Sequence, residues 1–142
     1  MRYWIGVASY DQVLNGVKGG FCQLGHGKKP ALEKMKTDDW IVYYSPRQEF
    51  APHSQTLQAF TAIGQILARE TYQADMGNFK PWRRDVRFLE VAQIVPIRPL
   101  IAKLEFIKDP KRWGYPFLHG HLEIGRSDFE LIASLFEVQL AV

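Results

Sequence analysis

Residues 57–67 are the part of the sequence that most constrains the fold. Side chains along a strand alternate between the two faces of a sheet, and in this segment both faces are apolar. The two sets are Leu57, Ala59 and Ile63, and Phe60, Ala62 and Ile66. A strand that is apolar on both faces lies at the centre of a sheet or curls around a barrel. Gly64 within it indicates a bulge or a close approach of another segment.

Four further segments have the β-branched and aromatic composition of strands. They are residues 2–8, 40–44, 84–95 and 117–124. In the third of these the apolar phase shifts near Phe88, which predicts a bulge. Residues 15–29, 46–55 and 70–82 are rich in Gly, Pro or polar side chains and are predicted to be loops.

Two short helices are predicted. Pro30 favours the start of a helix over residues 31–36. Ser127 and Glu130 have the spacing of a capping box, with Ser127 as the N-cap of an amphipathic helix.

Five strands without βαβ alternation predict an α+β fold, in which a small bent or closed sheet carries helices at its rim. The length of 142 residues fits one domain over residues 1–142. The hydrophobic fraction of 46% is too high for a disordered chain.

The composition also restricts the cellular compartment and the kinds of binding partner that we expect. A single Cys excludes a disulfide framework within the chain and a Cys-only zinc site, so a reduced, cytoplasmic setting is expected. No apolar run approaches the roughly 20 residues of a membrane helix, so no membrane partner is expected. The formal charge of +3 is compatible with nucleic acid but too small for tight non-specific binding to DNA.

The glycine-rich segment from Gly16 to Lys29 is the strongest functional candidate. Glycines let backbone N–H groups approach a ligand closely, and the lysines suit phosphate. The segment has neither the Walker A spacing nor the Rossmann glycine pattern. A flexible surface loop explains it equally well, and the residues alone leave both interpretations open.

Basic side chains surround Trp82 at Lys80, Arg83, Arg84 and Arg87. Arginine beside an aromatic ring suits a groove that follows a nucleic-acid backbone. A solvated sheet edge is the alternative, and for these residues alone it is slightly favoured. Period 2 places Arg83 and Arg84 on opposite faces of the strand.

Evidence for catalysis or for a metal is weak. His119, His121 and Glu123 share one face of a predicted strand, but a His pair without a metal is the commoner arrangement. Cys22 has no feature that would lower its thiol pKa beside His26. We therefore expect no catalytic residues, no metal and no cofactor.

Amphipathic aromatic residues are more numerous than a core of this size prefers. They include Trp4, Trp40, Tyr43, Tyr44, Trp82 and Trp113. Two or three of them facing a cleft would form a slot for a flat ring such as a nucleobase.

Several segments together resemble the EVE domain family, and more narrowly its small stand-alone prokaryotic members. They are residues 3–9, 16–28, 39–46, 58–64, 83–86, 106–107 and 113–114. The resemblance covers nearly the whole chain and implies a PUA-like fold, which is a bent, barrel-like sheet of five strands, mixed or antiparallel, with flanking helices. The chain departs from the family pattern at Gly25, a position where the family is expected to have a second Cys.

The resemblance also implies a function, since the family is similar to YTH and ASCH domains and is thought to recognise modified bases in DNA or RNA. A base would be flipped into an aromatic-lined pocket. The implied ligand-binding residues are Trp4, Ser9, Gly19, Gly20, Phe21, Gln23, His26, Lys28, Tyr43 and Ser45. The implied backbone contacts are Lys80, Arg83, Arg84 and Arg87.

Two alternatives remain beside a non-catalytic reader. One is a general RNA-binding module of the PUA type. The other is a hydrolase of modified nucleosides like some ASCH relatives, which would need Lys28, Thr61 and Glu33 to converge in the pocket.

Overall fold

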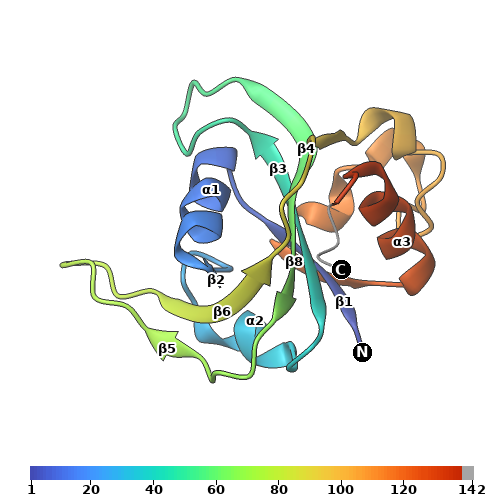
Figure 1. Cartoon of the computed structure of the whole chain (residues 1–142). Coiled ribbons are helices and arrows are strands. Elements are labelled where there is room, and N and C mark those ends of the chain that lie inside the picture. The colour runs from blue at the N-terminus through green and yellow to red at the C-terminus, as the bar shows by residue number, and fades with distance from the viewer. Residues whose placement is uncertain (139–142) are drawn as a thin grey trace.

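A computed structural model describes residues 1–138 of the chain, and a curled mixed sheet forms its centre (Figure 1). Its hydrogen-bonded strands follow the order β2-β6-β4-β3-β1-β8, while β5 pairs with β6 and β7 with β4. The strands are β1 (Tyr3–Val7), β2 (Phe21–Cys22), β3 (Trp40–Arg47), β4 (Thr56–Ile66), β5 (Tyr72–Gln73), β6 (Trp82–Phe88), β7 (Val95–Pro96) and β8 (His121–Ile124). The helices are α1 (Tyr10–Gly19), α2 (Lys29–Lys34) and α3 (Arg126–Leu135), with 3-10 turns η1 (Arg98–Leu100), η2 (Pro110–Arg112) and η3 (Tyr115–Phe117).

The prediction of a central strand over residues 57–67 is confirmed by β4. This strand pairs antiparallel with β3 on one side and with β6 and β7 on the other. A Cβ atom added at Gly64 would lie 2.5 Å from Cγ1 of Val86 and 3.0 Å from the Arg87 carbonyl oxygen. Gly64 therefore permits a close approach of β6, which is one of the two arrangements that the sequence indicated.

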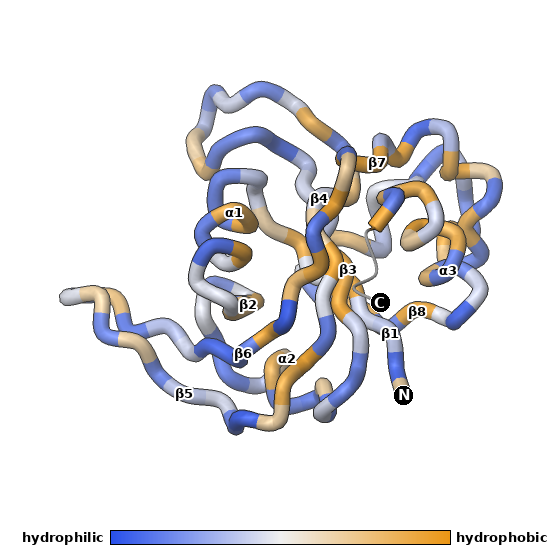
Figure 2. Tube along the Cα trace, viewed as in Figure 1, coloured by the Kyte–Doolittle hydropathy of each residue, from blue (hydrophilic) through white to orange (hydrophobic). Residues whose placement is uncertain are grey.

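The sheet is buried on both faces, because each central strand contributes to two cores. Ile41 and Tyr43 of β3 pack on the side of α1 and α2, whereas Val42 and Tyr44 pack toward η1–η3 and α3. Figure 2 shows apolar residues concentrated along the central strands, between the two layers. Successive side chains of β3 point to opposite faces of the sheet, so this strand packs against both layers, which come from distant parts of the sequence.

The structure corrects the prediction of a loop over residues 15–29. The first part of that segment belongs to α1, which ends at Gly19 and is followed by Gly20 in the left-handed conformation. Gly16 is buried, and a Cβ there would lie 2.6 Å from the carbonyl oxygen of Phe21. Close packing against β2 therefore outweighs the low helix propensity of glycine.

The ends of several other elements also differ from the predictions. The strand predicted over 84–95 ends as β6 at Phe88, and β8 begins at His121 rather than at residue 117. The N-cap of α3 is Gly125, so Ser127 lies inside the helix and forms no capping box. Asp128 of α3 instead accepts the backbone N–H groups of Glu105 and Phe106 at 2.8 and 3.0 Å.

Within residues 1–138, no helix combines the length and the apolar character needed to cross a membrane.

Candidate functional site

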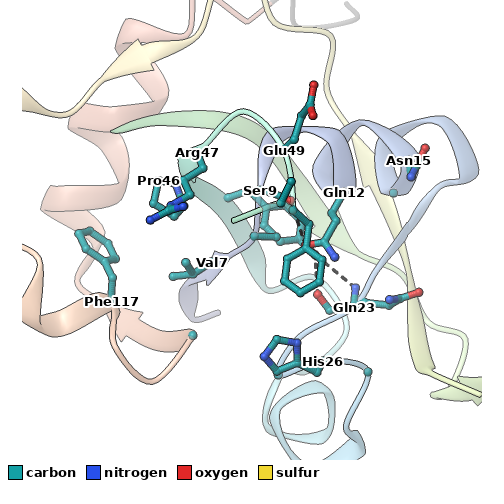
Figure 3. A pocket seen from close by; sticks show the side chains of 18 of the residues that line it. Val7, Ser9, Gln12, Asn15, Gln23, His26, Pro46, Arg47, Glu49 and Phe117 are labelled. Atoms are coloured by element: carbon teal, nitrogen blue, oxygen red, sulfur yellow. Dashed lines mark hydrogen bonds between the residues drawn. The ribbon is translucent and has the colours of Figure 1, made fainter. Parts of the chain in front are cut away.

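An open cavity of about 1040 Å³ lies beyond the C-terminal end of β1 (Figure 3). Five segments line it: the end of β1 with the first half of α1, residues 21–27, β3 with the β3–β4 loop, the β5–β6 hairpin and the turn before β8. Its volume is at the upper end of the range typical of small-ligand sites. Val7 and Phe117 lie across the cavity from Gln23 and His26.

Tyr43 anchors the glycine-rich segment to the sheet. Its hydroxyl donates to the carbonyl oxygen of Gln23 at 3.0 Å and accepts the Gln23 N–H at 3.3 Å. Burial raises the pKa of Tyr43 well above its ordinary value, so the hydroxyl stays protonated, and able to donate, at alkaline as well as neutral pH. The backbone of Gln23 is thereby fixed at both of its polar groups.

Arg83 forms a charged part of the cavity wall. Its guanidinium carbon lies 3.9 Å from the centre of the Phe21 ring, and its Nε donates to Oε1 of Gln23 at 2.6 Å. A second nitrogen lies 3.2 Å from the sulfur of Met76. The pairing of β2 with β6 brings Arg83 next to Phe21 and Gln23, which lie about sixty positions earlier in the sequence.

Asp11 ties the β3–β4 loop to the start of α1. Its carboxylate accepts the Ser9 hydroxyl at 2.5 Å and the backbone N–H groups of Gln12 and Phe50 at 2.8 and 3.2 Å. Partial burial acts to raise the pKa of Asp11, but the hydrogen bonds from Ser9, Phe50 and Gln12 outweigh it and lower the pKa below its ordinary value. The loop at the cavity edge is therefore held by an ionised group.

The cavity edge carries exposed apolar side chains from three separate loops. They are Phe50, Met76, Phe79 and Leu118. Phe50 is 67% exposed, and its ring centre lies 6.2 Å from that of His26. Exposed apolar groups that gather around a hollow are typical of a binding surface.

Residues 2–135 match the EVE domain family. The chain belongs to this family. It is 50% identical over 141 residues to a UPF0310 protein of Mycolicibacterium gilvum (strain PYR-GCK), with 99% of each chain covered. It is 43% identical over 141 residues to UPF0310 protein YdcG of Bacillus subtilis (strain 168), covering 99% of this chain and 95% of that one.

Solved structures share the fold of this EVE domain at low sequence identity. Human THYN1, in complex with DNA containing 5-methylcytosine, has a TM-score of 0.58 and 13% identity, and covers 99% of this chain and 100% of that one. Rpa0253 from Rhodopseudomonas palustris has a TM-score of 0.55 and 15% identity, with coverages of 96% and 93%. The predicted α+β, PUA-like fold is confirmed.

Besides His119, which was considered for a metal, six of the implied ligand-binding and backbone-contact residues lie around the cavity of the EVE domain. They are Ser9, Phe21, Gln23, His26, Tyr43 and Arg83. The first five come from the implied ligand-binding set, and Arg83 comes from the implied backbone contacts.

Five of the implied ligand-binding residues lie outside the cavity lining. Trp4 is buried, and its indole Nε1 donates to Asp39 at 3.0 Å. The Ser45 hydroxyl is buried 2.8 Å from that of Thr61. Gly19 and Gly20 end α1, and Lys28 immediately precedes α2.

Arg84 is placed inside the protein, so it is not a surface contact for phosphate. Its guanidinium donates to the carbonyl oxygens of Leu32, at 3.2 Å, and of Met35, and so supports the end of α2. Arg87 donates to Gln65 at 2.9 Å outside the cavity, and Lys80 is exposed on the hairpin.

The arrangements considered for a metal or for catalysis do not form. His121 stacks on Trp4 with ring centres 4.7 Å apart, while Glu123 pairs with Arg2 at 3.6 Å. In the part of the chain that the structure describes, no group of three or more His, Cys, Asp or Glu residues is placed to hold a metal ion.

The residues considered for catalysis are likewise not brought together at the cavity. Cys22 is buried, and burial raises its thiol pKa to about 12, which leaves it unreactive at neutral pH. Thr61 bonds Ser45, and Glu33 pairs with Lys29 at 3.3 Å. None of Lys28, Thr61 and Glu33 lines the cavity.

Several cavity residues were not found from sequence. They include Gln12, Asn15, Arg47, Phe50, Met76, Phe79 and Leu118. Phe50 and Phe79 had one available signal, since each is a large apolar residue within a segment that otherwise has loop composition. The others lie on segments whose meeting depends on the tertiary fold.

Proposed function

We propose that the cavity binds one base turned out of a nucleic-acid strand, and that the protein is a non-catalytic reader of a modified base in DNA or RNA. The observation that carries this proposal is the combination of an aromatic edge with a fixed polar wall. Phe50 and His26 form the edge, while Tyr43 and Arg83 fix Gln23 in the wall. Flipped bases are held by stacking together with hydrogen bonds to the base edge.

The comparison with human THYN1 supports the class of ligand. That protein has the same fold and is bound to DNA containing 5-methylcytosine. At 13% identity, individual contacts in that complex are not transferred to this chain, so the proposed contacts are taken from the cavity described above.

The energies involved set the degree of selectivity that we expect. Stacking on an aromatic side chain contributes about 1–3 kcal/mol per base, and turning the base out costs a few kcal/mol. Burying one added methyl group contributes roughly 0.8 kcal/mol, which is about a fourfold preference. Discrimination among bases must therefore depend mainly on shape and on the hydrogen bonds of the base edge.

The charge distribution supports a phosphate backbone as part of the ligand. Residues 98–112 contain five basic and two acidic residues, a formal charge of +3 that equals the charge of the whole chain. The basic side chains are all exposed, at Arg98, Lys103, Lys108, Lys111 and Arg112. This segment leads directly into η3, whose Phe117 lines the cavity.

Fluorescence anisotropy with short labelled oligonucleotides tests the proposal. Single-stranded and duplex DNA and RNA, each with one modified or plain base, are compared at low salt. We expect a preference for at least one modified base, and at least roughly tenfold weaker binding by Phe50→Ala. Leu67→Ala, an exposed apolar residue outside the cavity, is the control. Equal affinity for all modified and plain oligonucleotides contradicts the proposal.

A general RNA-binding module is the second candidate, and the basic segment at 98–112 favours it. This alternative predicts a steep dependence of affinity on salt and no response to base chemistry. A shallow salt dependence with a strong preference for one base contradicts it.

A further inference from the structure

We propose that Arg83 orients the Gln23 amide so that the cavity offers a hydrogen-bond donor, and that the bound base presents an acceptor to it. This inference rests on the proposed function and adds which kind of base edge the cavity recognises. Gln23 is the specificity-determining residue, and Arg83 is a positioning residue that acts through it.

The chemistry of arginine determines the orientation of the amide. A guanidinium has five N–H donors and no acceptor, whereas a Gln amide has one oxygen and one NH₂ group. Because Nε of Arg83 lies 2.6 Å from the Gln23 amide, the atom facing it must be Oε1. A hydrogen bond from a charged donor is stronger than one between neutral groups, so this orientation is favoured over rotation of the amide.

Both residues are held from other sides as well. Phe21 and Gln23 are two positions apart, and both contact the same guanidinium, one by its ring and one by its amide oxygen. The Gln23 backbone is bonded through its N–H and its carbonyl to the buried Tyr43 hydroxyl. The Gln23 backbone and the Arg83 guanidinium are therefore both fixed in place, and the hydrogen bond between Arg83 and Oε1 sets the orientation of the amide.

The group left for a ligand is the Nε2 of Gln23. Among residues 1–138 this nitrogen donates no hydrogen bond to a protein acceptor, and Gln23 lines the cavity. A ligand that accepts from Nε2 bonds Gln23 without competing with Arg83 for Oε1. Cytosine-type bases meet this requirement because N3 and O2 are adjacent acceptors on their pairing edge.

The substitution Gln23→Glu tests the donor at position 23 without changing the shape of the side chain. A carboxylate has the same outline and still accepts from Arg83, but its second oxygen accepts where Nε2 donated. Gln65→Glu is the charge control, because Gln65 Oε1 accepts from Arg87 at 2.9 Å outside the cavity; its Nε2 donates to the Asp38 carbonyl oxygen at 3.1 Å, so this variant also loses one hydrogen bond away from the cavity. Both substitutions add one negative charge, so their difference isolates the effect within the cavity.

The probes are oligonucleotides that carry one 5-methylcytosine or an analogue weakened at a single acceptor, with N3 replaced by C–H or O2 replaced by sulfur. We expect the wild type to bind at least one analogue about tenfold or more weakly than 5-methylcytosine. We expect Gln23→Glu to bind 5-methylcytosine about tenfold or more weakly and to distinguish the analogues less than twofold. Gln65→Glu should behave as the wild type.

Arg83→Lys tests the positioning role by a different readout. Lysine keeps the charge but lacks the planar fork that faces Oε1, so the amide becomes free to turn. We expect the ratio of affinities between 5-methylcytosine and its weakened analogue to fall toward one, with a smaller change in the affinity itself.

The outcomes separate this inference from the proposed function. If the wild type prefers a modified base but Gln23→Glu retains its full affinity and discrimination, the donor assignment is wrong and the reader function remains. The assignment is also wrong if a neutral methylphosphonate linkage weakens binding while both base analogues do not, because the acceptor is then a phosphate. If the wild type binds no oligonucleotide, both fail.

Discussion

His26 and Phe50 face each other at the edge of the cavity, with ring centres 6.2 Å apart and planes inclined by 57°. His26 lies in the glycine-rich segment and has a positive φ of 60°. Phe50 lies in the β3–β4 loop, where its backbone N–H is bonded to Asp11. The position of the Phe50 ring therefore depends on a carboxylate at the start of α1.

We expect Asp11→Asn to loosen the loop around Phe50 without unfolding the protein. The variant should weaken oligonucleotide binding by roughly two- to tenfold and speed amide exchange at Phe50. Ser9→Ala removes one of the hydrogen bonds to Asp11 and should have a smaller effect in the same direction. Unchanged exchange at Phe50 in Asp11→Asn would show that the carboxylate does not hold the loop.

The bond from Asp11 also predicts a pH dependence. The pKa of Asp11 is lowered in the folded protein, so its stabilising contribution is present above the ordinary carboxyl pKa near 3.8 and is lost as the pH falls through the lower folded value. The chemical shift of the Phe50 amide should be constant from pH 7 to about 4 and change only below that. Asp11→Asn should remove the transition.

His121 is expected to destabilise the fold in mild acid. Burial, with a smaller contribution from the nearby charge of Lys34, lowers the pKa of His121 from 6.5 to about 4. Between these values the unfolded chain binds the proton and the folded chain does not, so stability should fall as the pH drops from about 6.5 to 4. The loss is at most roughly 3–4 kcal/mol.

Urea denaturation at several pH values measures this effect. His121→Gln should flatten the dependence between pH 6.5 and 4, while the exposed His119→Gln should not. Protonation should also change the fluorescence of Trp4, whose ring centre is 4.7 Å from that of His121, with a midpoint at about pH 4. A midpoint near the ordinary value of 6.5 would show that His121 is not desolvated.

The basic segment at residues 98–112 should set the salt dependence of binding. Replacing Lys108, Lys111 and Arg112 with Ala should reduce the slope of log K against log salt by about 0.7–0.9 for each phosphate that is no longer neutralised. A variant with Lys18, Lys34 and Lys36 replaced has the same change in net charge elsewhere on the surface. Equal slopes for the two variants would mean that 98–112 has no special role.

Gly64→Ala should destabilise the sheet by about 1–3 kcal/mol, because the new methyl group would meet Val86 and the backbone of β6. Thermal or urea denaturation measures the change. Gly114→Ala is the control, since nothing lies within 4 Å of its added Cβ and its φ is −77°. Equal stability of the two variants would show that β6 can move away from Gly64.

Arg83 and Arg84 show how much of the site can be predicted from the sequence. They are adjacent, and period 2 correctly separates them onto opposite faces of a strand. The pattern does not say which face packs against α2, and the family resemblance implied a nucleic-acid backbone contact for both. Only the fold reveals that Arg84 supports α2 while Arg83 reaches Gln23.

The local sequence by itself determined the central strand, the five main strands, the α+β class and membership of the EVE family. These follow from apolar periodicity and from motifs, which depend on residues close together in the chain. The tertiary structure decided that α1 is a helix despite its glycines, that Trp4 is buried, and that Ser9, Gln23, Phe50 and Arg83 share one cavity. Burial and contacts between distant segments are properties of the packed chain, and they outweigh local propensity wherever the two disagree.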